Sequence, residues 1–137
     1  KDDEINYIED KGLSRQIKQK NFEEDQLGHF YKNAKVFVFP SQYEGFGIPV
    51  LESMACGCPI ILSNSASFPE VAGDAGIYFD TTSEEDLRSK IRMLLDDDNL
   101  RTQFSEKGLE QVKKFDWKVA AEQCLEVYRQ AVEDKRK

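Results

Sequence analysis

The sequence has little of what marks a disulfide-stapled or metal-binding protein. It holds three cysteines and one histidine in 137 residues. An odd number of cysteines does not suit a disulfide framework, and the C-G-C spacing of Cys56 and Cys58 lacks further metal ligands nearby. We therefore predict that these two and Cys124 are small core or cap residues in a reducing compartment, and we expect no metal site.

Long hydrophobic runs and an excess of basic residues are also missing. No apolar stretch approaches the ~20 residues of a membrane helix, and no secretory leader opens the sequence. The formal net charge of −7 argues against nucleic-acid binding, because phosphate contacts need clustered Lys and Arg. We expect a cytoplasmic protein, with any peripheral contact to the inner face of a membrane made by parts outside this sequence.

What the sequence does contain is a strand–loop–helix–strand pattern near its middle. Residues 36–39 form an unbroken apolar run of β-branched and aromatic side chains, which predicts a strand buried on both faces. A helix should follow, with Pro49 at its start and Glu52 in its first turn. Residues 60–62 predict a second strand, so the whole stretch predicts a parallel crossover unit.

The loop between that first strand and the helix is the predicted site. Gly45 and Gly47 flank Phe46, which suggests unusual backbone angles or the close approach of a ligand. Ligands of parallel sheets bind beyond the carboxyl ends of the strands, so this loop, with Glu44, should share a rim with residues 63–68. Those residues are either a simple turn or a source of hydroxyls and amides for the site.

Before the crossover unit, the pattern predicts a helix at the start of the chain, a strand over residues 17–22 and a short helix over residues 23–33. The strand has a poor composition, but it lies where a further sheet strand is due. In the short helix, Leu27, Phe30 and Tyr31 are expected to face the core.

After the crossover unit, a strand is expected at residues 76–79, and three helices close the chain. Ser83 and Asp116 are predicted caps of the first and the third. The acidic run 96–98 is expected to be a solvated loop rather than a calcium site. The third helix has an apolar seam that is predicted to belong to the core, formed by Trp117, Ala121, Cys124, Leu125, Tyr128 and Val132.

This pattern resembles the donor-site motif of retaining GT-B glycosyltransferases, especially family 4. Seven residues separate Glu44 from Glu52, and Gly45-Phe46-Gly47 directly follows the first acid. The phrase FVFPSQYEGFGIPVLESMACGCPII is similar to that family over its whole length. The likeness covers most of the chain, from about residue 5 to about residue 128.

The resemblance implies a nucleotide-diphosphate sugar as donor, with neither a cofactor nor a metal. It gives Glu44 a catalytic place at the donor sugar and Glu52 a place at the ribose. The resemblance also places the backbone of four residues at the sugar and the phosphates, namely Gly45, Phe46, Gly47 and Ile48.

The resemblance also implies a fold, which is a three-layer Rossmann-like α/β domain with a parallel sheet and helices on both faces. Such a domain has about six strands, and four are predicted here. We therefore predict one domain over residues 1–137, trimmed at its N-terminal edge and forming the C-terminal half of a GT-B enzyme. The acceptor-binding domain and the Arg and Lys that hold the diphosphate would lie upstream, so this stretch alone should be inactive.

The predicted function is donor binding in the transfer of a hexose to an acceptor, in glycan or polysaccharide synthesis. Two alternatives stay open, a non-catalytic nucleotide- or sugar-binding module and a GT-B sugar-nucleotide epimerase. Binding without transfer would favour the module, and an altered sugar without an acceptor would favour the epimerase. The bare spacing of Glu44 and Glu52 also fits a loop acid and an ordinary helix-start acid.

Overall fold

A small parallel sheet lies at the centre of the structure, a computed structural model that describes residues 2–65 and 67–135. Its strands are β1 (Phe37–Phe39), β2 (Ile60–Ser63) and β3 (Gly76–Phe79), in the order β1-β2-β3. Both pairs are parallel, with Val38 opposite Ile61 and Ile61 opposite Ile77. The parallel arrangement predicted for the strands at residues 36–39 and 60–62 is confirmed by β1 and β2.

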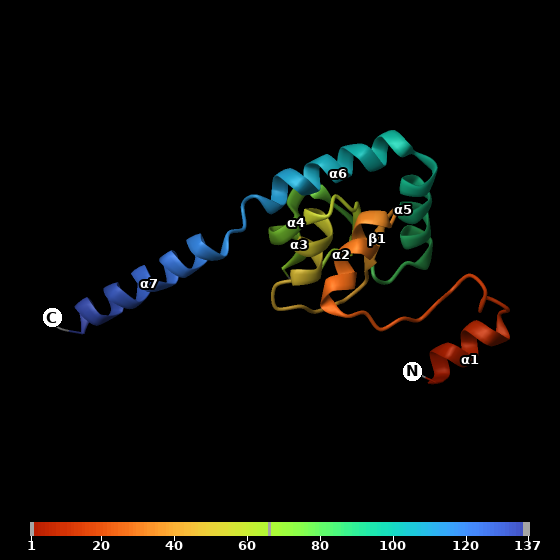
Figure 1. Cartoon of the computed structure of the whole chain (residues 1–137), viewed down its shortest axis with the longest axis horizontal. Coiled ribbons are helices and arrows are strands. Elements are labelled where there is room, and N and C mark those ends of the chain that lie inside the picture. The colour runs from red at the N-terminus through yellow and green to blue at the C-terminus, as the bar shows by residue number, and fades with distance from the viewer. Residues whose placement is uncertain (1, 66, 136–137) are drawn as a thin grey trace.

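Helices surround this sheet and extend beyond it (Figure 1). They are α1 (Asp2–Asp10), α2 (Glu24–Asn33), α3 (Ile48–Ala55), α4 (Phe68–Ala72), the 3-10 turn η1 (Gly73–Ala75), α5 (Glu84–Asp96), α6 (Asp98–Val112) and α7 (Trp117–Asp134). None of the described helices is long and apolar enough to cross a membrane.

Alternating side chains of the strands build two cores, one on each face of the sheet. On one face, Ile60 and Leu62 of β2 pack with Met54 of α3 and Phe68 of α4. This arrangement follows from the period of two along a strand, which sends successive side chains to opposite faces. All four residues of β2 are buried, as expected of a central strand covered on both sides.

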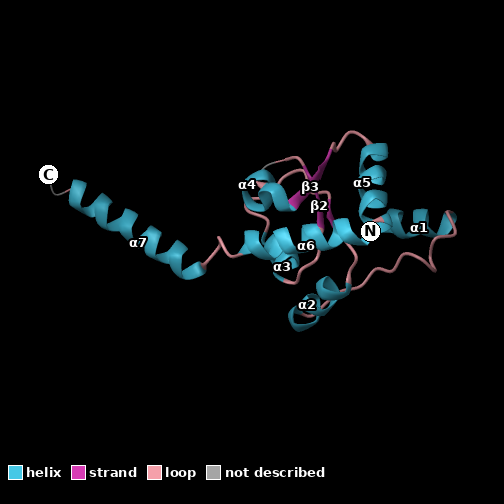
Figure 2. Cartoon of the chain, turned by 90° about the horizontal axis from the view of Figure 1, so that it is seen from above, coloured by secondary structure: helices cyan, strands magenta, loops and turns pink. Residues whose placement is uncertain are grey.

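The second core lies between the sheet and α5, with α6 bridging the two cores. Ile61 and Phe79 pack with Leu94 of α5, and Phe104 of α6 joins them from the side. Near its other end, α6 packs Val112 against the first core. Figure 2 shows the strands between α4 and α5. The predicted three-layer α/β fold is confirmed.

The predicted strand over residues 17–22 is wrong, because the chain there has no strand conformation. Phe22 packs on Phe30 of α2, with 4.1 Å between the ring centroids, and Ile17 is 45% exposed. The lysines, glutamine and asparagine of this stretch have weak strand preference. Within the described residues, β1 therefore pairs on one side only.

The apolar seam of α7 does not belong to the core, which corrects the sequence-based prediction. Trp117 is 81% exposed, Tyr128 is 68% exposed and Leu125 is 52% exposed. Cys124 is exposed as well. Figure 1 shows α7 projecting away from the helices and the sheet. Helical periodicity identified a face suited to burial, but the surface that would cover it is not in the described part of the chain.

The helix caps follow the sequence closely. Ser83 accepts a hydrogen bond from the Asp86 amide and Asp116 accepts one from the Lys118 amide, so both predicted caps are confirmed. The acidic run 96–98 is not a loop, because α5 ends and α6 begins within it. Asp97 caps α6 by accepting from the amide of Leu100, which uses a carboxylate where the helix dipole favours one.

Two smaller predictions about burial hold only in part. Tyr31 of α2 faces the core and is 7% exposed, but Phe30 is 39% exposed and packs on Phe22 instead. Cys58 is a buried core residue as predicted, and Cys56 is half-buried after the end of α3.

Candidate functional site

Three loops leave the carboxyl ends of the strands and form one rim, with described residues 40–47, 64–65 and 67, and 80–83. The first two are joined by side-chain hydrogen bonds. The Ser63 hydroxyl donates to the Ser41 carbonyl, and the Ser67 hydroxyl donates to the Phe46 carbonyl at 3.1 Å. The predicted sharing of a rim by these two loops is therefore confirmed.

Gly47 has the backbone conformation that only glycine adopts readily. Its φ is +92°, in the left-handed region, and it immediately precedes α3. A Cβ added there would lie 3.0 Å from Cε1 of Phe68. Gly45 differs, because it has no positive φ and a Cβ would meet open space. Of the two predicted reasons for glycine in this loop, unusual backbone angles are confirmed for Gly47, and for Gly45 the close approach of a ligand stays a prediction.

The start of α3 offers a small set of backbone donors. The first N–H groups of a helix lack intrahelical acceptors and favour anions. Pro49 has no N–H, and the Val50 N–H donates to the Gly47 carbonyl at 2.9 Å. The amides of Gly47 and Ile48 are therefore the ones best placed to receive an anion at this end.

Glu44 lies on the loop just before these amides and is half-buried. Its carbonyl lies 3.5 Å from the Ser67 hydroxyl. Its carboxylate makes no hydrogen bond or ion pair with another described residue. The loop at Glu44 is thus held through its backbone, and among the described residues no side chain or amide bonds to the carboxylate.

Glu52 lies in the second turn of α3, because the helix begins at Ile48, and the predicted first-turn position is wrong. Its side chain is exposed. Burial raises the pKa of Tyr31 to about 12, and the nearby charge of Glu52 adds to that rise. Glu52 also lines an open groove of about 530 Å³ with Phe46 and Ile48. The structure thus brings three predicted site residues together in this groove, and Glu44 lies on the adjoining loop.

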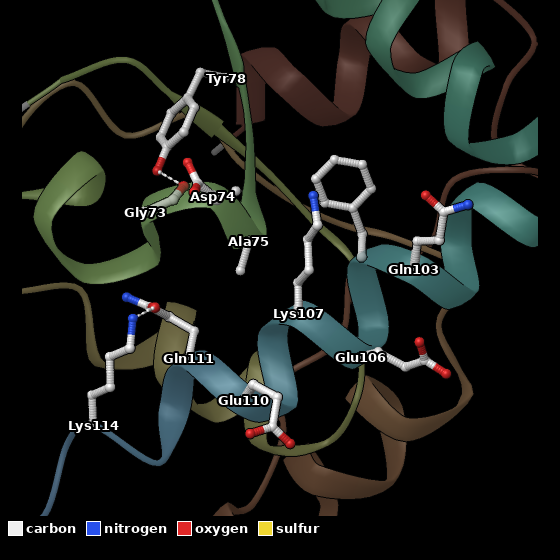
Figure 3. A pocket seen from close by; sticks show the side chains of 12 residues that line it. Gly73, Asp74, Ala75, Tyr78, Gln103, Glu106, Lys107, Glu110, Gln111 and Lys114 are labelled. Carbon is white, nitrogen blue, oxygen red and sulfur yellow. Dashed lines mark hydrogen bonds between the residues drawn. The ribbon is translucent and has the colours of Figure 1, made fainter.

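A second hollow, of about 950 Å³, lies at the other end of the sheet, between η1 and α6 (Figure 3). Its polar groups hold the fold together. Gln111 donates to the Val71 carbonyl at 2.9 Å and accepts from Lys114, while the Tyr78 hydroxyl donates to the Gly73 carbonyl. None of the predicted site residues lines it, so the rim is the stronger candidate site.

The sequence did not reveal the specific role of Ser67, although one interpretation of residues 63–68 was that they supply hydroxyls to the site. The Ser67 hydroxyl hydrogen-bonds to the backbone of the loop that carries Glu44, instead of remaining unbonded at the rim. Only the polar, serine-rich composition of this segment signalled such a role. Its partner lies 21 residues away, a distance that no local pattern encodes.

Residues 1–111 match the family described as glycosyl transferases group 1. Together with the parallel sheet and the rim at its carboxyl ends, this match defines the class of protein. The chain belongs to the group 1 glycosyltransferase family, and the part that it resembles is the C-terminal Rossmann-like half of the GT-B fold.

Relatives of known name are consistent with that assignment. The chain is 41% identical over 106 residues to the O-antigen chain mannosyltransferase B of Escherichia coli, covering 77% of this chain and 28% of that protein. It is 37% identical over 103 residues to a serotype-specific mannosyltransferase of the same species, covering 75% of this chain and 13% of that protein. The chain thus spans less than a third of the length of these two relatives.

Solved structures agree on the fold. The sucrose-phosphate synthase of Thermosynechococcus elongatus matches with a TM-score of 0.85 and 26% identity, over 95% of this chain and 34% of that one. The C-terminal domain of a group 1 glycosyl transferase from Francisella tularensis matches with a TM-score of 0.69 and 27% identity, over 80% of this chain and 58% of that one. The first match covers so much of this chain that most of α7 is included.

Proposed function

We propose that this chain is the donor-binding part of a retaining glycosyltransferase, which moves a hexose from a nucleotide-diphosphate sugar to an acceptor in glycan or polysaccharide synthesis. Membership of the family and the names of the relatives support the reaction class. The observation that carries the assignment of the site is the Glu44 carboxylate, which makes no hydrogen bond or ion pair with another described residue and belongs to the loop that leads into the amides of Gly47 and Ile48.

The chemistry of transfer explains why these groups would stand together. Breaking the glycosidic bond builds positive charge at the anomeric carbon and negative charge on the departing diphosphate, so donors aimed at the diphosphate stabilise the transition state. The amides of Gly47 and Ile48 are such donors. Glu44 accepts hydrogen bonds from sugar hydroxyls and so orients the ring.

The start of α3 cannot neutralise a diphosphate by itself. An exposed helix N-terminus stabilises an anion by only about 0.3–1 kcal/mol. The negative charges of Glu44 and Glu52 disfavour a diphosphate at the same place. Cationic side chains elsewhere in the protein would supply the remainder. We accordingly propose that neither a metal nor a cofactor takes part. Among residues 2–65 and 67–135, no group of His, Cys, Asp and Glu is arranged to hold a metal ion.

Glu52 is proposed to bind the ribose of the nucleotide. Its carboxylate is exposed in the groove that also holds Phe46 and Ile48, and it stands about one turn beyond the amides assigned to the diphosphate. Two carboxylate oxygens suit the two neighbouring hydroxyls of a ribose. Replacing Glu52 by Ala should weaken competitive inhibition by UDP or GDP, and unchanged inhibition would contradict this role.

The exposed seam of α7 is proposed to pack against another part of the same protein, such as an acceptor-binding domain. The relatives are more than three times longer than the matched stretch, and the T. elongatus match includes most of α7. Large apolar side chains such as Trp117 and Tyr128 gain most from such burial. We also propose a cytoplasmic location, which suits three free cysteines.

The experiment that tests the proposed function is Glu44→Gln in the intact glycosyltransferase, assayed with a panel of UDP- and GDP-sugars. A neutral amide weakens hydrogen bonds that a carboxylate makes, by about 1.5–3 kcal/mol, so turnover should fall at least about tenfold. The melting temperature should stay unchanged, because the carboxylate has no partner among the described residues.

Glu106→Gln is the matched control, because Glu106 lies at the opposite end of the sheet and is exposed. It should keep wild-type turnover. A folded Glu44→Gln enzyme with wild-type turnover would contradict the assignment of Glu44. Donor binding without transfer would point to a binding module, and a changed sugar without an acceptor would point to an epimerase.

A further inference from the structure

Ser67 occupies the N-cap position of α4 but does not cap that helix. A serine at this position usually accepts a hydrogen bond from an amide two or three residues later. Here no side-chain cap bond is present. The hydroxyl donates instead to the Phe46 carbonyl at 3.1 Å, with the Glu44 carbonyl at 3.5 Å. Ser67 therefore serves the neighbouring loop rather than its own helix.

A second hydroxyl holds the other end of the same loop. Ser63, at the end of β2, is fully buried, and its hydroxyl donates to the carbonyl of Ser41. Residues 63–67 thus bond to loop 41–46 at both of its ends, and Glu44 lies between these two points. The ring of Phe68 lies beneath Gly47 and limits how far the loop can move inward.

Two further contacts hold the ends of this loop: the Ser41 hydroxyl donates to the Tyr43 carbonyl at 3.1 Å, and the ring of Phe46 meets that of Phe115 with 5.8 Å between their centroids. The residues around Glu44 have little packing. Tyr43 is 85% exposed, Gly45 has open space around it, and Gln42 is exposed. Because residues 42, 43 and 45 are exposed, the hydrogen bonds from Ser63 and Ser67 are the contacts that join the segment around Glu44 to the end of β2 and the start of α4. Losing one of them should alter where the loop points more than it alters the stability of the domain.

We propose that Ser67 is a positioning residue for glycosyl transfer. Its hydroxyl fixes the backbone on either side of Gly45, and thereby aims the Glu44 carboxylate at the donor sugar nucleotide. Ser67 itself acts through the loop and not on the substrate. This inference rests on the proposed function of Glu44.

The test uses the intact glycosyltransferase with the variants Ser67→Ala, Ser67→Thr, Glu44→Gln and the double variant Ser67→Ala/Glu44→Gln. Small misplacements of a positioning group are costly, so Ser67→Ala should lower kcat about tenfold. The KM for the donor should change less than about twofold, because the groove that holds the nucleotide is untouched. Threonine keeps the hydroxyl and should restore most of the lost kcat.

The double variant separates an effect through Glu44 from an independent one. If Ser67 acts by aiming Glu44, then Ser67→Ala should add little to the loss that Glu44→Gln already causes. Ser89→Ala is the matched control, since its hydroxyl donates within α5 to the Asp86 carbonyl at 2.8 Å, away from the rim. It should leave both kinetic constants unchanged, and melting temperatures should report that every variant is folded.

The possible results lead to different conclusions. Wild-type kcat in Ser67→Ala, while Glu44→Gln is impaired, would overturn this inference alone. A threonine variant as slow as the alanine variant, or full additivity with Glu44→Gln, would overturn it as well. Wild-type turnover in Glu44→Gln would instead overturn the proposed function of the site, and with it the basis of this inference.

Discussion

β2 and α7 both carry strong apolar patterns, yet they end in opposite environments. All four residues of β2 are buried, whereas no residue of α7 is. β2 lies between β1 and β3, and helices cover it on both faces of the sheet. All of these covering elements belong to the described part of the chain. The seam of α7 finds no partner in the described part of the chain. An apolar pattern therefore reveals that a surface is suited to burial, without revealing what buries it.

This difference also separates two kinds of functional element. The rim is built on the sheet, so the cores on its two faces fix where the rim loops begin and end. α7 is exposed along its length within the described part of the chain, and its proposed role is to pack against another part of the protein. Substitutions in the two regions should consequently have different effects in this chain and in the intact enzyme.

The largest expected contrast is between two leucines. Leu62→Ala removes a fully buried side chain and should lower the free energy of unfolding by about 2–5 kcal/mol. Leu125→Ala, at a position 52% exposed, should change it by no more than about 0.5 kcal/mol. Urea unfolding of this chain measures both values. Equal losses would mean that α7 is covered in solution and that the comparison is wrong.

A smaller contrast is expected within the rim, between Gly47 and Gly45. Gly47→Ala should cost about 1–3 kcal/mol, because alanine resists a positive φ and its Cβ would press on Phe68. Gly45→Ala should cost nothing measurable, since neither restriction applies there. The same unfolding experiment compares them. If both variants lose equal stability, the backbone of Gly47 is not the constraint described above.

The smallest expected effect is the alkaline pH dependence of stability. Burial raises the pKa of Tyr31 from 10.0 to about 12, so its stabilising contribution is complete below pH 10 and is lost as the pH rises toward 12. Tyr31→Phe should flatten the fall in unfolding free energy over that range. Burial likewise raises the pKa of Cys58 from 9.0 to about 11, so some of the fall should remain in that variant.

The exposed α7 supplies the matched control for this experiment. Leu125→Ala removes no ionisable group, and its alkaline profile should follow that of the wild type. An unchanged slope in Tyr31→Phe would show that Tyr31 is not held neutral by the packing of α2 against α3.

The sequence predicted well those features that depend on nearby residues. The strand at β1, the helix at α3 and the caps at Ser83 and Asp116 follow from local periodicity and from short-range hydrogen bonds. The left-handed backbone at Gly47 was likewise within reach, since glycine between a loop and a helix often marks such a turn.

Features that depend on distant partners were not predictable in the same way. The strand over residues 17–22 needs a neighbouring strand to pair with, and its side chains are too polar to impose one. The partner of the Ser67 hydroxyl is set by how two loops meet in space. Whether Glu52 lies in the first or the second turn of α3 depends on whether the helix begins at Ile48 or at Pro49. Sequence patterns locate such a helix boundary only to within one or two residues.

The most direct test of the central claim is a titration of this chain with UDP- and GDP-sugars, followed by the NMR signals of its backbone amides. We predict binding near millimolar or weaker, about −4 kcal/mol, with the largest shifts at Gly45, Gly47 and Ile48. The amides of α7 beyond Gln123, which do not line the groove of Glu52, and those of the hollow beside Gly73 should show no shift. Shifts confined to that hollow, or no shift at the rim at saturating donor, would contradict the assignment of the rim as the donor site.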